Sequence, residues 1–145
     1  MKTVRQMLHG KSPLISVSLT ATVFDALALM AQHDVGALVV LEEGRLAGMF
    51  SERDYARKVI LHGKSSKDTP VGEIISHQLC VAAPDSTIEE CMRLMTTNRV
   101  RHLPVLEGEA LAGLVSIGDL VNYIISAQSV EILQLQSYIT GQYPG

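Results

Sequence analysis

The sequence predicts an α+β protein made of two β-α-β-β-α units that pack as a pair around a pseudo-two-fold axis. The main observation is an internal repeat, because residues 22–54 align without a gap to residues 87–119 when shifted by 65 positions. In both copies, apolar residues at helical spacing precede two short apolar runs, which gives each unit the same order of elements. The positions that are identical in the two copies are Thr22, Leu29, Met30, Val35, Leu38, Val40, Leu41, Glu42, Leu46, Ala47, Gly48, Ser51 and Asp54.

The elements of each unit follow from local signals. Thr22 and Thr87 precede the apolar residues at helical spacing and are suited to cap a helix. The two short runs that follow are long enough only for strands, and the acidic, glycine-containing turn between them is typical of a hairpin. We expect these strands at Ala37–Leu41 and Leu46–Phe50 in the first copy, and at Leu103–Leu106 and Leu111–Val115 in the second. A second helix is expected after Ser51 and after Ser116, and one further strand near Ile15–Val17 and near Leu79–Ala82.

The repeat divides the chain into a first module at 1–62, a linker at 63–70, a second module at 71–126 and a C-terminal helix and tail at 127–145. The linker is polar and contains both glycine and proline. Val71–Ile75 mirrors Val4–Leu8 as the lead-in to each copy, and Ser129–Ile139 is expected to form a short helix for packing or dimerisation. A module of this size buries little surface alone, so the two copies are expected to pack their sheets against each other.

Composition excludes several classes of partner. The formal net charge of −3 gives no general attraction to a phosphate backbone, and four tyrosines, two phenylalanines and no tryptophan leave little for base stacking. No apolar segment reaches the roughly 18 to 20 residues that cross a bilayer, and MKTVRQMLHG holds no long apolar run. We therefore expect no nucleic-acid or membrane partner, no signal peptide and a cytoplasmic location, where Cys80 and Cys91 stay reduced.

Catalytic and metal chemistry find no support in the spacing of polar residues. The five histidines share no metal-ligand spacing with one another or with the cysteines, so no metal is expected. No nucleophile-and-base arrangement or acid pair is distinctive. We therefore expect no catalytic residue and no catalytic cofactor.

The junction between the hairpin and the second helix carries the most informative motif. It reads Ser51-Glu52-Arg53-Asp54 in the first copy and Ser116-Ile117-Gly118-Asp119 in the second. A hydroxyl at a helix start with an acid three residues later is typical of a capping box. The same geometry suits a nucleotide, because free backbone N–H groups and a serine hydroxyl hold phosphate and a carboxylate accepts ribose hydroxyls. Both interpretations remain open at this point.

Each motif is preceded by a glycine and two hydrophobic residues, and the whole resembles a known family. Gly-hydrophobic-hydrophobic-Ser/Thr-x-x-Asp at the end of a β-α-β-β-α repeat is similar to the nucleotide-binding signature of CBS (cystathionine β-synthase) domains. The stretch SERDYARKV at Ser51–Val59, followed by GKSSKDTPV, resembles one subgroup of stand-alone CBS-pair proteins. The resemblance implies a disc-like pair, often a homodimer, that binds AMP, ATP, NAD/NADH or S-adenosylmethionine between the modules as a regulatory signal.

The two copies differ around the motif, so the candidate sites are not interchangeable. The second copy has Arg99, Arg101, His102 and Pro104 where the first has Asp34, Gly36, Ala37 and Val39. Arg101 is suited to meet a phosphate as a bidentate donor, and a proline belongs at a strand start or edge, where it would leave an opening for an adenine. Alternatively, Arg99 and Arg101 form a solvated face. In the first copy the cations around the motif are Arg53, Arg57 and Lys58.

Three functions fit these observations. The first is a regulatory module that binds an adenine nucleotide (AMP, ATP or NAD/NADH) and signals occupancy to an unidentified partner protein. Its candidate ligand-binding residues are Ser51, Arg53, Asp54, Arg57, Arg99, Arg101, His102, Pro104, Ser116 and Asp119. The second is an interaction or scaffold protein in which the motifs are only capping boxes. The third is a small enzyme that acts on nucleotides.

Overall fold

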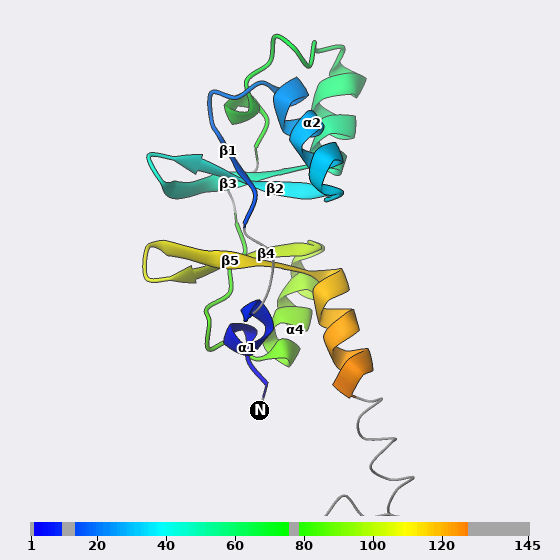
Figure 1. Ribbon diagram of the computed structural model, residues 1–145. Helices are drawn as coiled ribbons and strands as arrows, with labels where there is room; N and C mark the ends of the chain where they lie inside the picture. Colours follow the sequence, from blue (N-terminus) through cyan, green and yellow to red (C-terminus); the bar gives the residue numbers. More distant parts are fainter. Residues whose placement is uncertain (1, 10–13, 76–78, 128–145) are drawn as a thin grey trace, which may run out of the picture.

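The computed structural model describes residues 2–9, 14–75 and 79–127, and these form two stacked α+β modules (Figure 1). The elements run in the order α1 (Val4–Leu8), β1 (Ser16–Ser18), α2 (Val23–His33), β2 (Ala37–Glu42), β3 (Arg45–Ser51), α3 (Glu52–Asp54), η1 (Tyr55–Val59), η2 (Ile60–His62), η3 (Val71–Glu73), α4 (Ile88–Asn98), β4 (His102–Glu107) and β5 (Ala110–Ser116). Residues 117–127 are helical. The predicted fold class is confirmed. The helix expected at Ser129–Ile139 lies outside the described residues.

The helices begin where the threonines predict. The Thr22 hydroxyl accepts a hydrogen bond from the Asp25 N–H at 3.1 Å, and the Thr87 hydroxyl accepts one from the Glu90 N–H at 3.1 Å. Each bond satisfies one of the backbone donors that a helix start leaves without a partner. Both predicted N-caps are therefore confirmed.

Two sheets face each other between outer layers of helices. The first sheet has the order β1-β2-β3, with β1 parallel and β3 antiparallel to β2, and the second sheet pairs β4 with β5 in antiparallel fashion. The register shifts between Val40 and Leu41 in the first hairpin and between Val105 and Leu106 in the second. The irregularity thus recurs at equivalent positions of the repeat. Figure 1 shows α2 and residues 52–62 outside one sheet, and α4 and residues 117–127 outside the other.

The strands are continuously apolar because both faces of each sheet are covered. Leu38, Val40 and Phe50 are fully buried and pack in the core under α2. Val39, which lies between the first two in sequence, points to the opposite face and packs with Met49 in the layer between the modules. Successive strand residues point to opposite faces, so a strand buried on both sides needs an unbroken apolar run.

The further strand predicted at Leu79–Ala82 is reduced to one bridge, between Ala82 and Val105. The Ala82 N–H donates to the Pro104 carbonyl and the Leu106 N–H donates to the Ala82 carbonyl, each at 2.9 Å. The edge of β4 therefore faces residues 79–82, but Pro104 has no N–H that could donate a further hydrogen bond to this segment and extend the strand pairing. In the first module Val39 occupies the equivalent position, and there β1 pairs over Ser16–Ser18.

Each core includes a segment from the other half of the chain. Val4 in α1 is fully buried in the core of the second module, and its N–H donates to the Ser86 carbonyl at 2.9 Å. Val71 is fully buried in the core of the first module, and its N–H donates to the Ala21 carbonyl at 2.7 Å. The two lead-in segments mirror each other along the chain, as expected, but in space each packs on the other copy.

Candidate functional site

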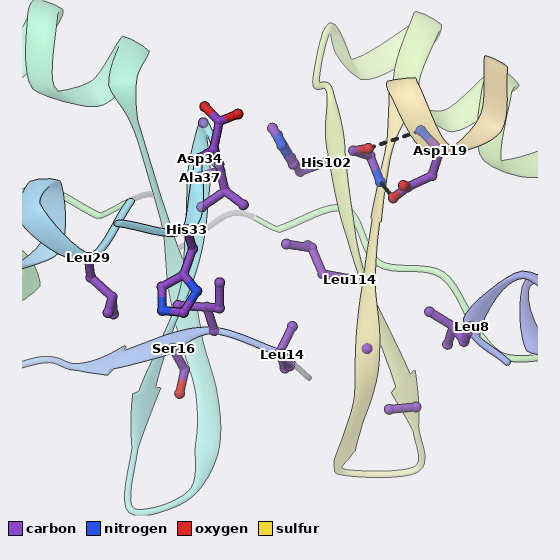
Figure 2. A pocket seen from close by; sticks show the side chains of 16 residues that line it. Leu8, Leu14, Ser16, Leu29, His33, Asp34, Ala37, His102, Leu114 and Asp119 are labelled. Carbon is purple, nitrogen blue, oxygen red and sulfur yellow. Dashed lines mark hydrogen bonds between the residues drawn. The ribbon is translucent and has the colours of Figure 1, made fainter. Parts of the chain in front are cut away.

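A cavity of about 1020 Å³ lies between the two modules (Figure 2). The first module contributes β1 and the turn between α2 and β2, and the second contributes β5 and the start of helix 117–127. Leu8 in α1 closes one side, since α1 packs on β5. A Cβ at Gly113 would stand only 2.8 Å from the Leu8 side chain, so a glycine lets α1 approach this strand. The cavity thus depends on both modules and on the exchanged first helix.

The wall from the first module is set by the end of α2. The helix ends at Asp34, which is in the left-handed conformation with φ 53° and whose N–H donates to the Ala31 and Met30 carbonyls. This turn sends the chain directly into β2 at Ala37. Asp34 is exposed, whereas Ala37 is 3% exposed. The polar group therefore stands at the rim of the cavity and an apolar surface lies deeper.

The wall from the second module carries the Ser-x-x-Asp junction. Asp119 Oδ2 accepts a hydrogen bond from the Ser116 N–H at 2.8 Å, and the Asp119 N–H donates to Ser116 Oγ at 3.1 Å. Figure 2 shows Asp119 on one side of the cavity, Asp34 on the other and His102 between them. The capping box is thus formed. A carboxylate has two oxygens and about four acceptor sites, so this role is compatible with binding a ribose.

The junction of the first module also forms a capping box. Asp54 Oδ2 accepts from the Ser51 N–H at 2.9 Å and from the Ser51 hydroxyl at 3.0 Å. Asp54 Oδ1 lies 3.3 Å from Lys58 Nζ, which also donates to the Ile74 carbonyl at 3.2 Å. This carboxylate is therefore partly neutralised by a cation on its own helix.

The structure divides the predicted site residues into groups. His102, Ser116 and Asp119 line the cavity, while Ser51 and Asp54 lie at the junction of the first module. Pro104 is buried within β4 and is not among the residues that line this cavity. The four predicted arginines have exposed side chains, on the first-module helix or at the turn between α4 and β4: Arg53, Arg57, Arg99 and Arg101.

Several residues that line the cavity were missed by the sequence argument. Ser16, His33 and Asp34 are polar, and Leu14 and Leu29 are apolar. A signal for them existed, because the repeat aligns Asp34 with Arg99 and both end their helices in the left-handed conformation with φ 53°. Because Arg99 is a candidate ligand-binding residue at this turn of the second copy, Asp34 is a candidate at the equivalent turn of the first.

The described part of the chain gives no support for a metal site, a membrane-spanning helix or a reactive Cys91 thiol. Within residues 2–9, 14–75 and 79–127, no group of three or more His, Cys, Asp or Glu side chains could hold a metal ion. In the same residues no helix has the length and apolar character to span a bilayer. Burial, with smaller contributions from Glu90 and Cys80, raises the pKa of the Cys91 thiol, which makes it a poor nucleophile at neutral pH.

Comparison with known proteins gives relatives along most of the chain. The mitochondrial CBS domain-containing protein CBSX3 of Arabidopsis thaliana is 45% identical over 127 residues. This match covers 84% of the chain but 62% of the plant protein, so the chain spans less than two thirds of that relative. The CBS domain-containing protein YhcV of Bacillus subtilis is 37% identical over 114 residues, which cover 79% of this chain and 81% of the relative.

Solved structures share the fold. A CBS-domain protein from Burkholderia ambifaria matches with a TM-score of 0.84 at 46% identity, over 88% of this chain and 96% of that one. The CBS domain pair of protein MJ0100, in complex with 5′-methylthioadenosine and S-adenosyl-L-methionine, matches with a TM-score of 0.78. It covers 88% of this chain and 98% of that one, but at 19% identity this likeness shows the fold alone.

The family assignment follows from where the matches fall. Residues 4–61 and 71–126 each match the CBS domain. Tandem CBS domains are regulatory, ligand-binding modules, and stand-alone CBS-domain proteins are generally non-catalytic. Because the two matched segments coincide with the two repeat units and the two stacked sheets, the resemblance seen in the sequence is confirmed, and the chain belongs to the CBS-domain family as a tandem pair.

Proposed function

We propose that the chain is a regulatory sensor that binds an adenine nucleotide of the AMP, ATP or NAD type between its modules and signals occupancy to a partner protein. The observation that carries this proposal is the cavity that sets the Ser116–Asp119 junction opposite the turn after α2. Its volume of about 1020 Å³ is ample for a small molecule, since such pockets hold roughly 300–1000 Å³. A ligand there touches both modules, so its binding favours one arrangement of the pair.

The chemistry of the cavity suits an adenosine group. In this proposal the Asp119 carboxylate accepts ribose hydroxyls, and the apolar side chains that line the cavity pack on the adenine: Leu14, Leu29 and Leu114. Leu14 is 38% exposed, so its side chain is accessible to a ligand in the cavity. In this proposal the adenine packs on Leu14 and excludes water from it.

A second site is proposed at the pseudo-two-fold equivalent of the cavity. In the repeat, Arg99 and Arg101 correspond to the cavity residues Asp34 and Gly36. Ser51 and Asp54 correspond to Ser116 and Asp119, so the equivalent site combines these two arginines with the first junction. Arg53 extends this positive charge on the motif-bearing helix, where the second copy has Gly118. Guanidinium groups form strong charge-assisted hydrogen bonds with phosphate. We also keep three other residues as proposed members of the two sites. These are Arg57, which lies one turn beyond Arg53, and His102 and Pro104, which lie on β4.

Calorimetry tests the proposal directly. The full-length chain, titrated with AMP, ATP, NAD, NADH and adenosine, should bind at least one ligand at micromolar strength or better, which corresponds to about 8 kcal/mol. Asp119→Ala should weaken binding in the cavity by about 2 kcal/mol, or roughly thirtyfold, because a charged acceptor is lost. Asp54→Ala is the matched control: it removes the same capping box at the other junction and should spare the cavity while weakening its own site.

The alternative function is a non-catalytic interaction or scaffold protein. The observation in its favour is that both junctions form complete capping boxes, so the motif has a structural role without a ligand. In that case Asp119→Ala costs about 1 kcal/mol of folding stability and no nucleotide gives heat or raises the melting temperature. Recovery of a bound nucleotide unchanged after incubation excludes an enzyme that acts on it.

We further propose a homodimer and a cytoplasmic location. Ile117, Val121 and Ile125 are 44%, 43% and 54% exposed and recur every four residues along the motif-bearing helix, so they share one face. A two-fold partner would cover this stripe. Light scattering at micromolar concentration should give the dimer mass, and Ile125→Glu should give the monomer. Cell fractionation tests the location, since the Arabidopsis relative is mitochondrial.

A further inference from the structure

Lys58 connects the motif of the first module to a segment that is distant in the sequence. Its Nζ lies 3.3 Å from Asp54 Oδ1 and donates a hydrogen bond to the Ile74 carbonyl at 3.2 Å. Asp54 stands four residues before Lys58, whereas Ile74 stands 16 residues after it. One ammonium group therefore joins the carboxylate of the first junction to the segment through which the chain passes into the second module.

The Asp54 carboxylate has little capacity left to accept further hydrogen bonds. A carboxylate offers about four acceptor sites, shared between its two oxygens. The Ser51 N–H and the Ser51 hydroxyl donate to Oδ2 at 2.9 and 3.0 Å, and Lys58 occupies a site on Oδ1. These contacts leave about one acceptor site. If both hydroxyls of a ribose donate to Asp54, they need two sites, so one of the present contacts has to break.

Lys58 is the contact that can most easily move away. The Ser51 N–H is fixed by the backbone at the helix start, and the Ser51 hydroxyl also accepts a hydrogen bond from the Asp54 N–H at 3.2 Å. Lys58 has a flexible four-carbon stem and a side chain that is 42% exposed, so its ammonium regains water when it leaves. Partly exposed ion pairs of this kind are weak. A ribose can therefore replace Lys58 on Asp54 at small cost.

We infer that Lys58 competes with the ribose for Asp54, and that its release passes occupancy of the first junction to the second module. A displaced Lys58 loses the anion that holds it beside the Ile74 carbonyl. Ile74 is 3% exposed, and a buried carbonyl that loses its donor is costly, so the backbone around it shifts to find another partner. Leu79, shortly after Ile74 in the chain, packs in the layer between the modules. This inference rests on the proposed site at the first junction and describes its regulation.

The competing contact belongs to the first module. The repeat aligns Lys58 with Tyr123, which packs against the core of the second module. A phenol never carries a positive charge, so Tyr123 cannot form the same ion pair with Asp119. The two junctions therefore share the motif but differ in this contact.

Two nucleotides that differ by one hydroxyl test the competition. AMP has both ribose hydroxyls, whereas 2′-deoxy-AMP lacks one and can donate to Asp54 without displacing Lys58. The backbone amide NMR signals of Ser51 and Asp54 report binding at the first junction, because both N–H groups belong to its capping box. The amide signal of Ile75 reports on the Ile74 carbonyl, with which it shares a peptide group. In the full-length chain AMP should shift the Ile75 signal, and 2′-deoxy-AMP should leave it in place.

Lys58→Met keeps a side chain of similar length and removes its charge. It should raise the ratio of AMP affinity to 2′-deoxy-AMP affinity about fivefold, which is the size expected for the loss of one partly exposed ion pair. Both nucleotides carry the same phosphate, so any contact between Lys58 and a phosphate cancels in this ratio. Lys58→Arg retains a cation at this position and should keep the ratio close to that of wild type.

The matched control is Lys64→Met, because Lys64 is an exposed lysine of the linker. It makes the same chemical change and should leave the ratio and the Ile75 response as in wild type. If Lys58→Met leaves the ratio unchanged, if Lys64→Met raises it equally, or if AMP leaves the Ile75 signal in place, the inference is wrong while the site stands. If AMP shifts neither the Ser51 nor the Asp54 signal, the proposed site at the first junction fails and the inference fails with it.

Discussion

The exchange of the lead-in segments makes a quantitative prediction at Val4. This side chain is fully buried in the core of the second module, although it lies at the opposite end of the chain from most of that core. Val4→Ala removes two methyl groups, worth about 1.6 kcal/mol of transfer free energy at about 0.8 kcal/mol each. The cavity left behind adds to this cost. We expect a loss of about 2–3 kcal/mol in the free energy of unfolding.

Urea denaturation followed by circular dichroism measures this loss. Val71→Ala is the matched variant in the first module, since Val71 is fully buried at the mirrored position, and it should cost a similar amount. Val81→Ala is the surface control, because Val81 is 38% exposed, and it should cost well under 1 kcal/mol. The three variants make the same chemical change in three environments.

Alkylation of Cys91 shows which core has opened. Cys91 is fully buried in the core of the second module, so a reagent reaches it only when that core opens. Val4→Ala should speed its alkylation more than Val71→Ala does, as read by mass spectrometry of the peptide. A Val4→Ala protein with unchanged urea midpoint and unchanged Cys91 alkylation would refute the packing of α1 on the second module.

Three further predictions follow from single contacts. Burial raises the pKa of Cys91 above its ordinary value of 9.0, so the folded state holds this proton longer than the unfolded state. The resulting stability is present below about pH 9 and is lost as pH rises through the raised value; Cys91→Ala should flatten that loss of melting temperature. Gly113→Ala should cost about 1–3 kcal/mol, because its Cβ would stand 2.8 Å from Leu8, and adding Leu8→Ala in a double-mutant cycle should show coupling. Thr22→Ala and Thr87→Ala should each cost about 1 kcal/mol in urea denaturation, and equal stability to wild type would contradict their role as caps.

Local signals in the sequence accounted for most of the elements. The threonine caps, the hairpins and the helix starts depend on neighbours within a few residues, and the repeat supplied each signal twice. The position of α1 could not be predicted in this way. Val4 and Val71 have similar local surroundings in the sequence. Neither segment contains a local signal that indicates which of the two cores will bury its valine.

The candidate site was predictable in part for a similar reason. Ser116 and Asp119 were found because their motif lies on one stretch of chain, whereas Asp34 joins them only through the packing of one module on the other. The weakening of the second upstream strand by Pro104 was also beyond a local signal. A proline removes one donor wherever it stands, but only the topology shows which neighbour needed that donor.

The crossed lead-in segments have a consequence for synthesis on the ribosome. The chain emerges from its N-terminus, so α1 appears early, yet β5, on which it packs, appears only after α4 and β4. The core of the first module lacks Val71 until the linker has been synthesised. Val4 can pack in the core of the second module only near the end of translation. Release of the two halves as separate polypeptides would leave each core without one buried segment. Nascent-chain pulling measurements should therefore show strong folding force only after residue 120 has left the exit tunnel, because Leu120 is the last fully buried residue in the described part of the second core.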